Sequence, residues 1–230
     1  MNKRINIITD PHSEDVDLFK KKAIVIKPGV TVLVGCNGSG KTTLLKQIKE
    51  NVKKRKEFII SFDNLKQGGQ TSLEEQMGKG NFGFVARYIQ YSEGENIMLN
   101  MSNIINTLGD IVKNKKLNDK KELWLLFDAV DSGLSIDNIV DLKTVFNMIL
   151  NDKRLIGKSI FIILTANSYE IARGERCYDV SNCEYVNIKS YEDYRNIVLK
   201  SSEIKSERYM KITELENSKN KRSLDFERQK

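Results

Sequence analysis

The chain has 230 residues, of which 40% are hydrophobic and 30% charged, a composition ordinary for a globular protein with a substantial core. No apolar run approaches the length needed to span a bilayer, and the N-terminal stretch is interrupted too soon by Asp10 to be a secretion signal. These features argue against membrane insertion, and we expect a cytoplasmic protein. The cysteines Cys36, Cys177 and Cys183 lack paired metal-ligand spacing, so we expect free thiols.

The charge balance of 38 Lys and Arg against 31 Asp and Glu gives a net charge of +7. Much of the excess gathers in lysine-rich runs at residues 20–22, 53–56 and 113–121. Such runs form either a solvated face or a patch that meets nucleic acid. They are short and not interleaved with aromatic residues, which favours the solvated face and leaves a nucleic-acid partner as the alternative.

Apolar segments along the chain predict alternating strands and helices. The expected strands are residues 4–9, 23–26, 31–34, 57–62, 122–127, 159–164 and 185–188. The expected helices are residues 41–54, 72–77, 94–114, 136–151 and 191–202 or beyond. This alternation predicts an α/β fold with a mostly parallel central sheet flanked by helices. We expect one domain over residues 1–204 and a charged tail at 205–230 that is either a frayed helix or disordered.

The most specific motif lies between the strand expected at 31–34 and the helix expected at 41–54. It matches the phosphate-loop pattern G-x-x-x-x-G-K-[ST] at every constrained position. Its residues are Gly35, Cys36, Asn37, Gly38, Ser39, Gly40, Lys41 and Thr42, with Thr43 following in the helix. Glycines let consecutive N–H groups converge on phosphate oxygens, and the helix N-terminus adds partial positive charge. We expect Lys41 to reach the β- and γ-phosphates and the Thr42 hydroxyl to hold Mg²⁺.

A second motif is the apolar run at 123–127, which ends in Asp128. This pattern is typical of a buried strand that presents a carboxylate at its C-terminal end, where ligands bind in such sheets. In phosphate-loop enzymes an aspartate at this place assists Mg²⁺ coordination. Because it follows a phosphate loop, we interpret Asp128 as a Mg²⁺ ligand rather than a turn residue.

Further motifs follow in an order that resembles ATP-binding-cassette (ABC) type ATPases, most closely their chromosome-maintenance (SMC) and recombination-repair branch. Residues 128–135 resemble the D-E-x-x-S/A-x-L-D/S segment of that family, and residues 91–95 resemble its S-x-G-E/Q signature. Residues 164–168 follow a strand where the family carries its switch histidine. The resemblance covers roughly residues 3–190 and implies an ABC-type phosphate-loop NTPase head that binds ATP and Mg²⁺. The short region between Gln70 and Ser92 leaves no room for long coiled-coil arms.

The resemblance also implies how the remaining site residues act. In the family, Ser92 and Gly94, followed here by Glu95, would cap the γ-phosphate held by a partner's phosphate loop. This arrangement implies a homodimer that encloses two ATP molecules. The family places a glutamine loop after the strand expected at 57–62, and both Gln67 and Gln70 are candidates to sense Mg²⁺ and the γ-phosphate.

Two positions depart from the family pattern. Ala129 stands where the family carries the glutamate that polarises the attacking water, and Asn167, with Ser168 as the alternative, stands in place of the switch histidine. Loss of a positioned general base typically costs about 10²–10⁴ in rate. The single histidine, His12, lies far upstream in an expected turn and offers no evident substitute. Asp131 is the nearest spare carboxylate, and we favour a role in fixing the turn or the dimer contact over one in activating water.

Three interpretations of Ala129 follow: slow hydrolysis with a substitute base, ATP binding as a dimerisation switch, or an engineered alanine that traps the ATP state. We predict an ATPase with slow or impaired hydrolysis, whose catalytic candidates are Asp128, Asp131 and Asn167. One alternative is a DNA-associated, ATP-dependent clamp or accessory protein of recombination, repair or phage DNA metabolism. The less favoured alternative is the ATP-binding subunit of a membrane transporter.

Overall fold

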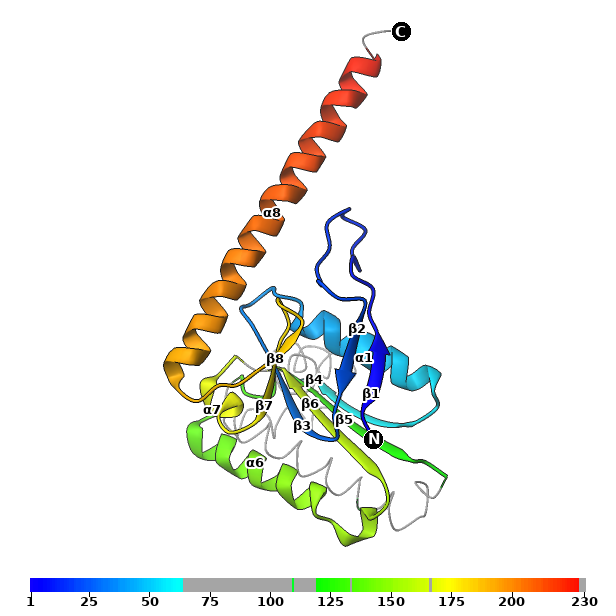
Figure 1. Ribbon diagram of the computed structural model, residues 1–230, viewed down its shortest axis with the longest axis vertical. Coiled ribbons are helices and arrows are strands. Elements are labelled where there is room, and N and C mark those ends of the chain that lie inside the picture. The colour runs from blue at the N-terminus through cyan, green and yellow to red at the C-terminus, as the bar shows by residue number, and fades with distance from the viewer. Residues whose placement is uncertain (64–108, 110–118, 133, 166, 228–230) are drawn as a thin grey trace, which may run out of the picture.

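The computed structural model describes residues 1–63, 109, 119–132, 134–165 and 167–227, over which strands and helices alternate (Figure 1). The strands are β1 (Lys3–Asn6), β2 (Ala23–Ile26), β3 (Gly29–Val34), β4 (Phe58–Asp63), β5 (Glu122–Asp128), β6 (Ser159–Thr165), β7 (Arg176–Asp179) and β8 (Glu184–Val186). The helices are α1 (Lys41–Lys54), α6 (Ile136–Leu150), α7 (Tyr169–Ala172) and α8 (Tyr191–Glu227), with a 3₁₀ turn η1 (Lys153–Leu155).

The central sheet has six strands in the order β4-β5-β6-β3-β7-β8. Neighbouring strands are parallel except for the edge pair β7 and β8, which is antiparallel. β1 and β2 form a separate antiparallel pair. A mixed, mostly parallel sheet flanked by helices confirms the α/β class that the alternation of apolar segments predicts.

Strand β5 shows why helices cover both faces of this sheet. All of its residues are buried, as expected of a central parallel strand. Leu123, Leu125 and Phe127 pack with α6 in one hydrophobic cluster, whereas Trp124 and Leu126 pack with α1 and the β1–β2 pair in another. The side chains alternate because successive residues of a strand point to opposite faces. The sheet therefore lies between two layers, with α6 on one face and α1 on the other (Figure 1).

Helix α8 is 37 residues long and extends away from the body of the molecule (Figure 1). Its first turns belong to the core, since Tyr194, Ile197 and Val198 pack in the cluster that contains α6. The sequence from residue 205 is compatible with a frayed helix or with disorder, and the structure continues the helix to Glu227. No glycine or proline lies within residues 191–227, so nothing in the sequence interrupts the helix.

Strand β7 belongs to the central sheet, and the sequence analysis missed it. It pairs in parallel with β3. Of its four residues, Cys177 and Tyr178 lie in the middle, and a charged residue lies at each end. This pattern contains no apolar run, so the strand is specified by its place beside β3. The Arg176 guanidinium at the start of the strand donates to the carbonyl of Pro28 over 2.9 Å. The sequence analysis also missed the four-residue helix α7 and the turn η1, whereas the other described elements agree with the expected ones to within a few residues at each end.

The three cysteines, Cys36, Cys177 and Cys183, are buried free thiols, as expected from their spacing. Burial raises the pKa of the Cys177 thiol to about 12, so this thiol stays protonated and unreactive at neutral pH.

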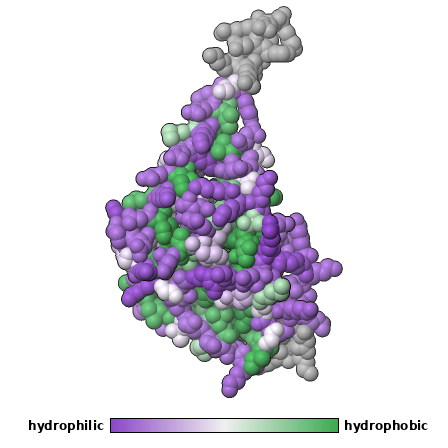
Figure 2. Space-filling view, in the orientation of Figure 1, coloured by the Kyte–Doolittle hydropathy of each residue, from purple (hydrophilic) through white to green (hydrophobic). Residues whose placement is uncertain are grey.

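The surface seen in Figure 2 is mainly hydrophilic, with apolar side chains interspersed among the polar ones. Exposed apolar residues include Ile136, Val140 and Met148 on α6. Within the described part of the chain, no helix is both long enough and apolar enough to cross a membrane.

Candidate phosphate-binding site

The candidate site lies at the edge of the sheet where the parallel strands β3, β5 and β6 end. β6 lies between β3 and β5 and is parallel to both. The loop after Val34, Asp128 at the end of β5 and Thr165 at the end of β6 therefore meet at one edge. Ligands of open α/β sheets bind at this edge, outside the carboxyl ends of the strands.

The loop between β3 and α1 requires glycine at two positions. Gly35 and Gly40 have φ angles of +144° and +97°, values that side chains disfavour. A Cβ atom would lie 2.7 Å from Ser39 Oγ if added at Gly35, and 3.0 Å from the Phe19 ring if added at Gly40. The close packing of this loop thus explains the glycine spacing of the motif.

Helix α1 begins directly after this loop, with Gly40 as its N-cap. Among the described residues no side chain caps this helix start, and its first turn holds no acidic residue. The first N–H groups of a helix have no partner within the helix, and they carry partial positive charge. The start of α1 is therefore suited to an external anion such as a phosphate group.

The Lys41 side chain folds back over the loop. Its ammonium donates to the carbonyl of Gly35 over 2.8 Å and to that of Cys36 over 3.0 Å, and the residue is only 8% exposed. Burial lowers the pKa of this ammonium, whereas the negative charges of Asp131 and Asp128 counteract the shift. A buried cation whose hydrogen bonds among the described residues go to carbonyl oxygens gains from an added anion, because the anion replaces the stabilisation that water would otherwise give to the charge.

Asp128 and Thr42, the two candidate Mg²⁺ ligands within the described residues, are in contact. The Thr42 hydroxyl donates to Asp128 Oδ1 over 3.0 Å, and the Thr165 hydroxyl donates to the same oxygen over 2.8 Å. Mg²⁺ prefers oxygen ligands and commonly uses one or two protein groups together with substrate phosphates. No cluster of three or more His, Cys, Asp or Glu suited to a metal occurs in the described chain. The Thr42 and Asp128 pair fits Mg²⁺ that is shared with a phosphate ligand.

Ala129 follows Asp128 in a left-handed conformation, with a φ angle of +52°. Its backbone N–H donates to Thr165 Oγ1 over 2.7 Å, so the hydroxyl of Thr165 joins this residue to Asp128. Ala129 lies in the wall of the cavity described below, where its methyl group can neither accept a proton nor orient water.

Asp131 is buried and holds the segment that follows β6. One of its oxygens, Oδ2, accepts hydrogen bonds from the backbone N–H groups of Asn167 and Ser168, each over 2.7 Å. Burial raises the pKa of this carboxyl, while the two N–H donors counteract the shift. Asp131 is not among the residues that line the cavity, whereas Asn167 is. The geometry therefore favours a positioning role for Asp131 over the activation of water.

A cavity of about 630 Å³ opens at this edge of the sheet. The expected site residues in its wall are Asn37, Gly38, Gly40, Lys41, Thr42, Thr43, Asp128 and Asn167. Gly35, Cys36 and Ser39 belong to the loop but do not line the cavity.

Besides Ser132, which follows β5, and Thr165, which ends β6, the sequence analysis missed five residues of the cavity wall: His12, Glu14, Leu18, Arg208 and Tyr209. They come from the segment between β1 and β2 and from α8. Arg208 forms an ion pair with Glu14 across 194 positions of sequence, so no local pattern marks the contact. His12 does lie in a turn, as expected, but that turn borders the cavity.

Several expected site residues lie outside the described residues. They are Gln67, Gln70, Ser92, Gly94 and Glu95, together with the expected helix at 72–77, nearly all of the one at 94–114 and most of the lysine run at 113–121. Of the described lysines, Lys20 donates to Asn182 Oδ1 and Lys21 to the carbonyl of Cys183. These two lysines join the chain before β2 to the β7–β8 turn, and a nucleic-acid partner stays a prediction.

In comparisons with known proteins, no protein-family model matches this chain and no curated protein matches it. The functional interpretation therefore depends on the geometry of the described residues and on the motifs themselves.

Proposed function

We propose that this chain binds ATP together with Mg²⁺ at the phosphate loop and hydrolyses it slowly. The observation that supports this proposal best is the meeting of Lys41, Thr42 and Asp128 at the glycine loop, with Thr42 Oγ1 3.0 Å from Asp128 Oδ1. A phosphate-binding loop, a buried lysine and a pair of hard oxygen ligands are the parts that Mg²⁺-nucleotide binding requires.

Each described residue has a place in this proposal. The N–H groups at the start of α1 and the Lys41 ammonium bind the phosphates, while Thr42 and Asp128 hold Mg²⁺, which neutralises charge on the phosphate oxygens. Thr165 fixes Asp128 by donating to its Oδ1. Asn167 offers an amide to the γ-phosphate, and Asp131 positions the Asn167 backbone. Ala129 supplies no base, which explains why we propose slow turnover.

The proposal extends to a homodimer of the ABC type, which rests on the resemblance of Ser92 and Gly94 to that family's signature. A nucleotide shifts a monomer–dimer equilibrium only by its differential affinity for the two states. We therefore expect gel filtration to show a dimer with Mg²⁺-ATP and less dimer with Mg²⁺-ADP. Equal elution with both nucleotides would remove the dimer from the proposal and leave nucleotide binding in place.

Thermal unfolding with and without Mg²⁺-ATP tests the binding itself. A ligand at 100 times its Kd stabilises the native state by about 2.7 kcal/mol. We expect the wild-type Tm to rise with Mg²⁺-ATP and the Tm of Lys41→Ala to stay constant. Lys46→Ala is the matched control, because Lys46 is an exposed lysine on the same helix and does not line the cavity. A constant Tm for wild type and both variants at saturating nucleotide would contradict the proposal.

A further inference from the structure

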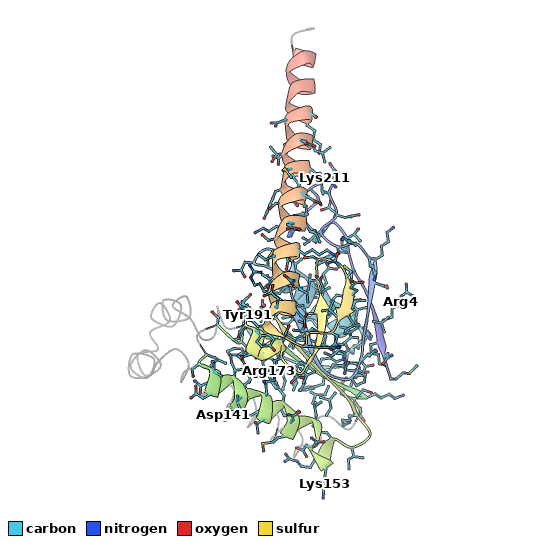
Figure 3. All side chains as sticks on the ribbon, turned by 60° about the vertical axis from the view of Figure 1, so that its left-hand side comes forward. Arg4, Asp141, Lys153, Arg173, Tyr191 and Lys211 are labelled. Atoms are coloured by element: carbon cyan, nitrogen blue, oxygen red, sulfur yellow. The ribbon has the colours of Figure 1, made fainter. Side chains whose placement is uncertain are left out.

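Helix α8 touches the phosphate loop along one of its sides. The backbone N–H of Cys36 donates to Ser201 Oγ over 3.0 Å, and the Lys205 ammonium donates to the carbonyl of Asn37 over 3.2 Å. Residues three and four apart lie on the same side of a helix, so Arg208 continues this row. Figure 3 shows α8 rising past the body of the molecule from Tyr191 through Lys211. The cavity at the phosphate loop is thus bounded by an element that begins more than 140 residues later in the chain.

Arg208 is the residue of α8 whose environment points to a ligand. Its side chain is only 11% exposed and lines the same cavity as Lys41, Thr42 and Asp128. A terminal nitrogen, Nη2, donates to Glu14, whose side chain is 34% exposed. The Nε atom is buried and has no hydrogen-bond partner among the described residues. A buried donor without an acceptor is costly, and a guanidinium that turns toward a ligand oxygen would relieve that cost.

The charges around the cavity are consistent with an anionic ligand. Among the described residues, its wall carries the cations Lys41 and Arg208 and the carboxylates Asp128 and Glu14. If the Asp128 carboxylate binds Mg²⁺, the charge of Lys41 alone does not neutralise the negative charge that remains on the phosphate chain. The planar guanidinium presents its N–H donors in a fork that matches two phosphate oxygens, and the phosphate chain carries more negative charge than the single carboxylate of Glu14.

We propose that Arg208 is a phosphate-binding residue supplied by α8, which leaves Glu14 and binds the phosphate chain of the nucleotide. This inference rests on the proposed nucleotide binding and deepens it, because it makes the C-terminal helix part of the site. Neither the phosphate loop nor the family resemblance, which covers roughly residues 3–190, includes α8.

Calorimetric titration of the full chain with Mg²⁺-ATP and with inorganic tripolyphosphate tests this assignment. Removal of a hydrogen bond between a charged side chain and a phosphate weakens binding by about 10- to 100-fold, so we expect Arg208→Gln to raise the Kd of both ligands by this factor. Arg195→Gln is the matched control, since Arg195 lies on α8 and pairs with the exposed Glu192. Weaker binding of ATP alone would place Arg208 at the ribose or base and overturn the proposal. Unchanged affinity for both ligands would overturn it too.

Glu14→Gln separates phosphate binding from a purely structural ion pair. Both Arg208→Gln and Glu14→Gln break the pair, so a structural role predicts that they weaken nucleotide binding alike. Our proposal predicts that Glu14→Gln binds as tightly as wild type or more tightly, because Arg208 loses a competing partner. Unfolding without nucleotide shows that each variant is folded. If wild type binds and Lys41→Ala does not, equal affinities for wild type and Arg208→Gln refute this inference alone. Absence of binding by wild type refutes the proposed function as well.

Discussion

The carboxylate of Asp131 accepts a hydrogen bond from the backbone N–H of Asn167 across 2.7 Å. The same oxygen accepts a second bond from Ser168, so one buried group joins the segment after β5 to the segment after β6. Both segments border the cavity at the phosphate loop, through Ala129 and Asn167. The position of Asn167 therefore depends on a residue that does not itself line the site.

Replacement of Asp131 by alanine would leave two N–H groups without their acceptor. Each unsatisfied buried group costs about 1–3 kcal/mol, so we expect Asp131→Ala to lower the free energy of unfolding by at least this amount. Asp131→Asn keeps an amide oxygen that can accept from the same donors, and we expect a smaller decrease. Urea denaturation of the three proteins measures the difference. Equal stability of wild type and Asp131→Ala would show that these bonds contribute little.

The raised pKa of Asp131 predicts a pH dependence of known sign. Its folded pKa lies above its ordinary value of 3.8, because burial penalises the charged form. The protonated Asp131 carboxyl contributes stability that is fully present below pH 3.8. This contribution is lost as the pH rises through the folded pKa. We expect the free energy of unfolding of wild type, relative to Asp131→Asn, to fall between about pH 4 and the raised pKa. A difference that stays constant or rises over this window would contradict the prediction.

Ser201 anchors α8 to the phosphate loop. Its hydroxyl accepts from Cys36 N over 3.0 Å and contacts the Ser181 hydroxyl over 2.6 Å, and Ser201 is 1% exposed. We expect Ser201→Ala to destabilise the protein by about 1–3 kcal/mol and to weaken Mg²⁺-ATP binding, because a loop N–H loses its acceptor. Ser206→Ala serves as control, since this exposed hydroxyl bonds only within α8 among the described residues. Similar effects of both substitutions would refute a specific anchor.

Ala129 permits a direct gain-of-function test. The proposed site lacks a group to polarise water, so we expect Ala129→Glu to raise ATP turnover by about 10²–10⁴. Ala129→Gln has nearly the same shape without a carboxylate, and we expect its turnover to stay near that of wild type. A phosphate-release assay on the three proteins, with Lys41→Ala as background, measures the change. Equal turnover of the Glu and Gln variants would show that position 129 does not supply the base.

Structural features that depend on residues close together in the sequence are the ones predicted best. The phosphate loop, α1 and the apolar strand before Asp128 each depend on neighbours within a few positions, and their places in the sheet bring Lys41, Thr42 and Asp128 together. The role of Thr165 is not predictable in this way, because its contact with Asp128 follows from the pairing of β5 with β6. Likewise, the ion pair of Arg208 with Glu14 depends on the direction in which α8 leaves the core.

Asp131 illustrates a choice that spacing alone does not make. Its position three residues after Asp128 is compatible with activating water and with fixing a turn. The structure shows its oxygen bonded to two N–H groups, and only this tertiary contact separates the two roles.

Calorimetric titration of Mg²⁺-ATP into wild type, Lys41→Ala and Lys46→Ala tests the central claim most directly. Lys41 lies buried under the phosphate loop, whereas Lys46 is exposed on the same helix. We predict that wild type and Lys46→Ala bind one nucleotide per chain with similar Kd and that Lys41→Ala shows no saturable binding. Equal affinity of all three proteins, or no binding by any of them, would contradict a nucleotide site at this loop.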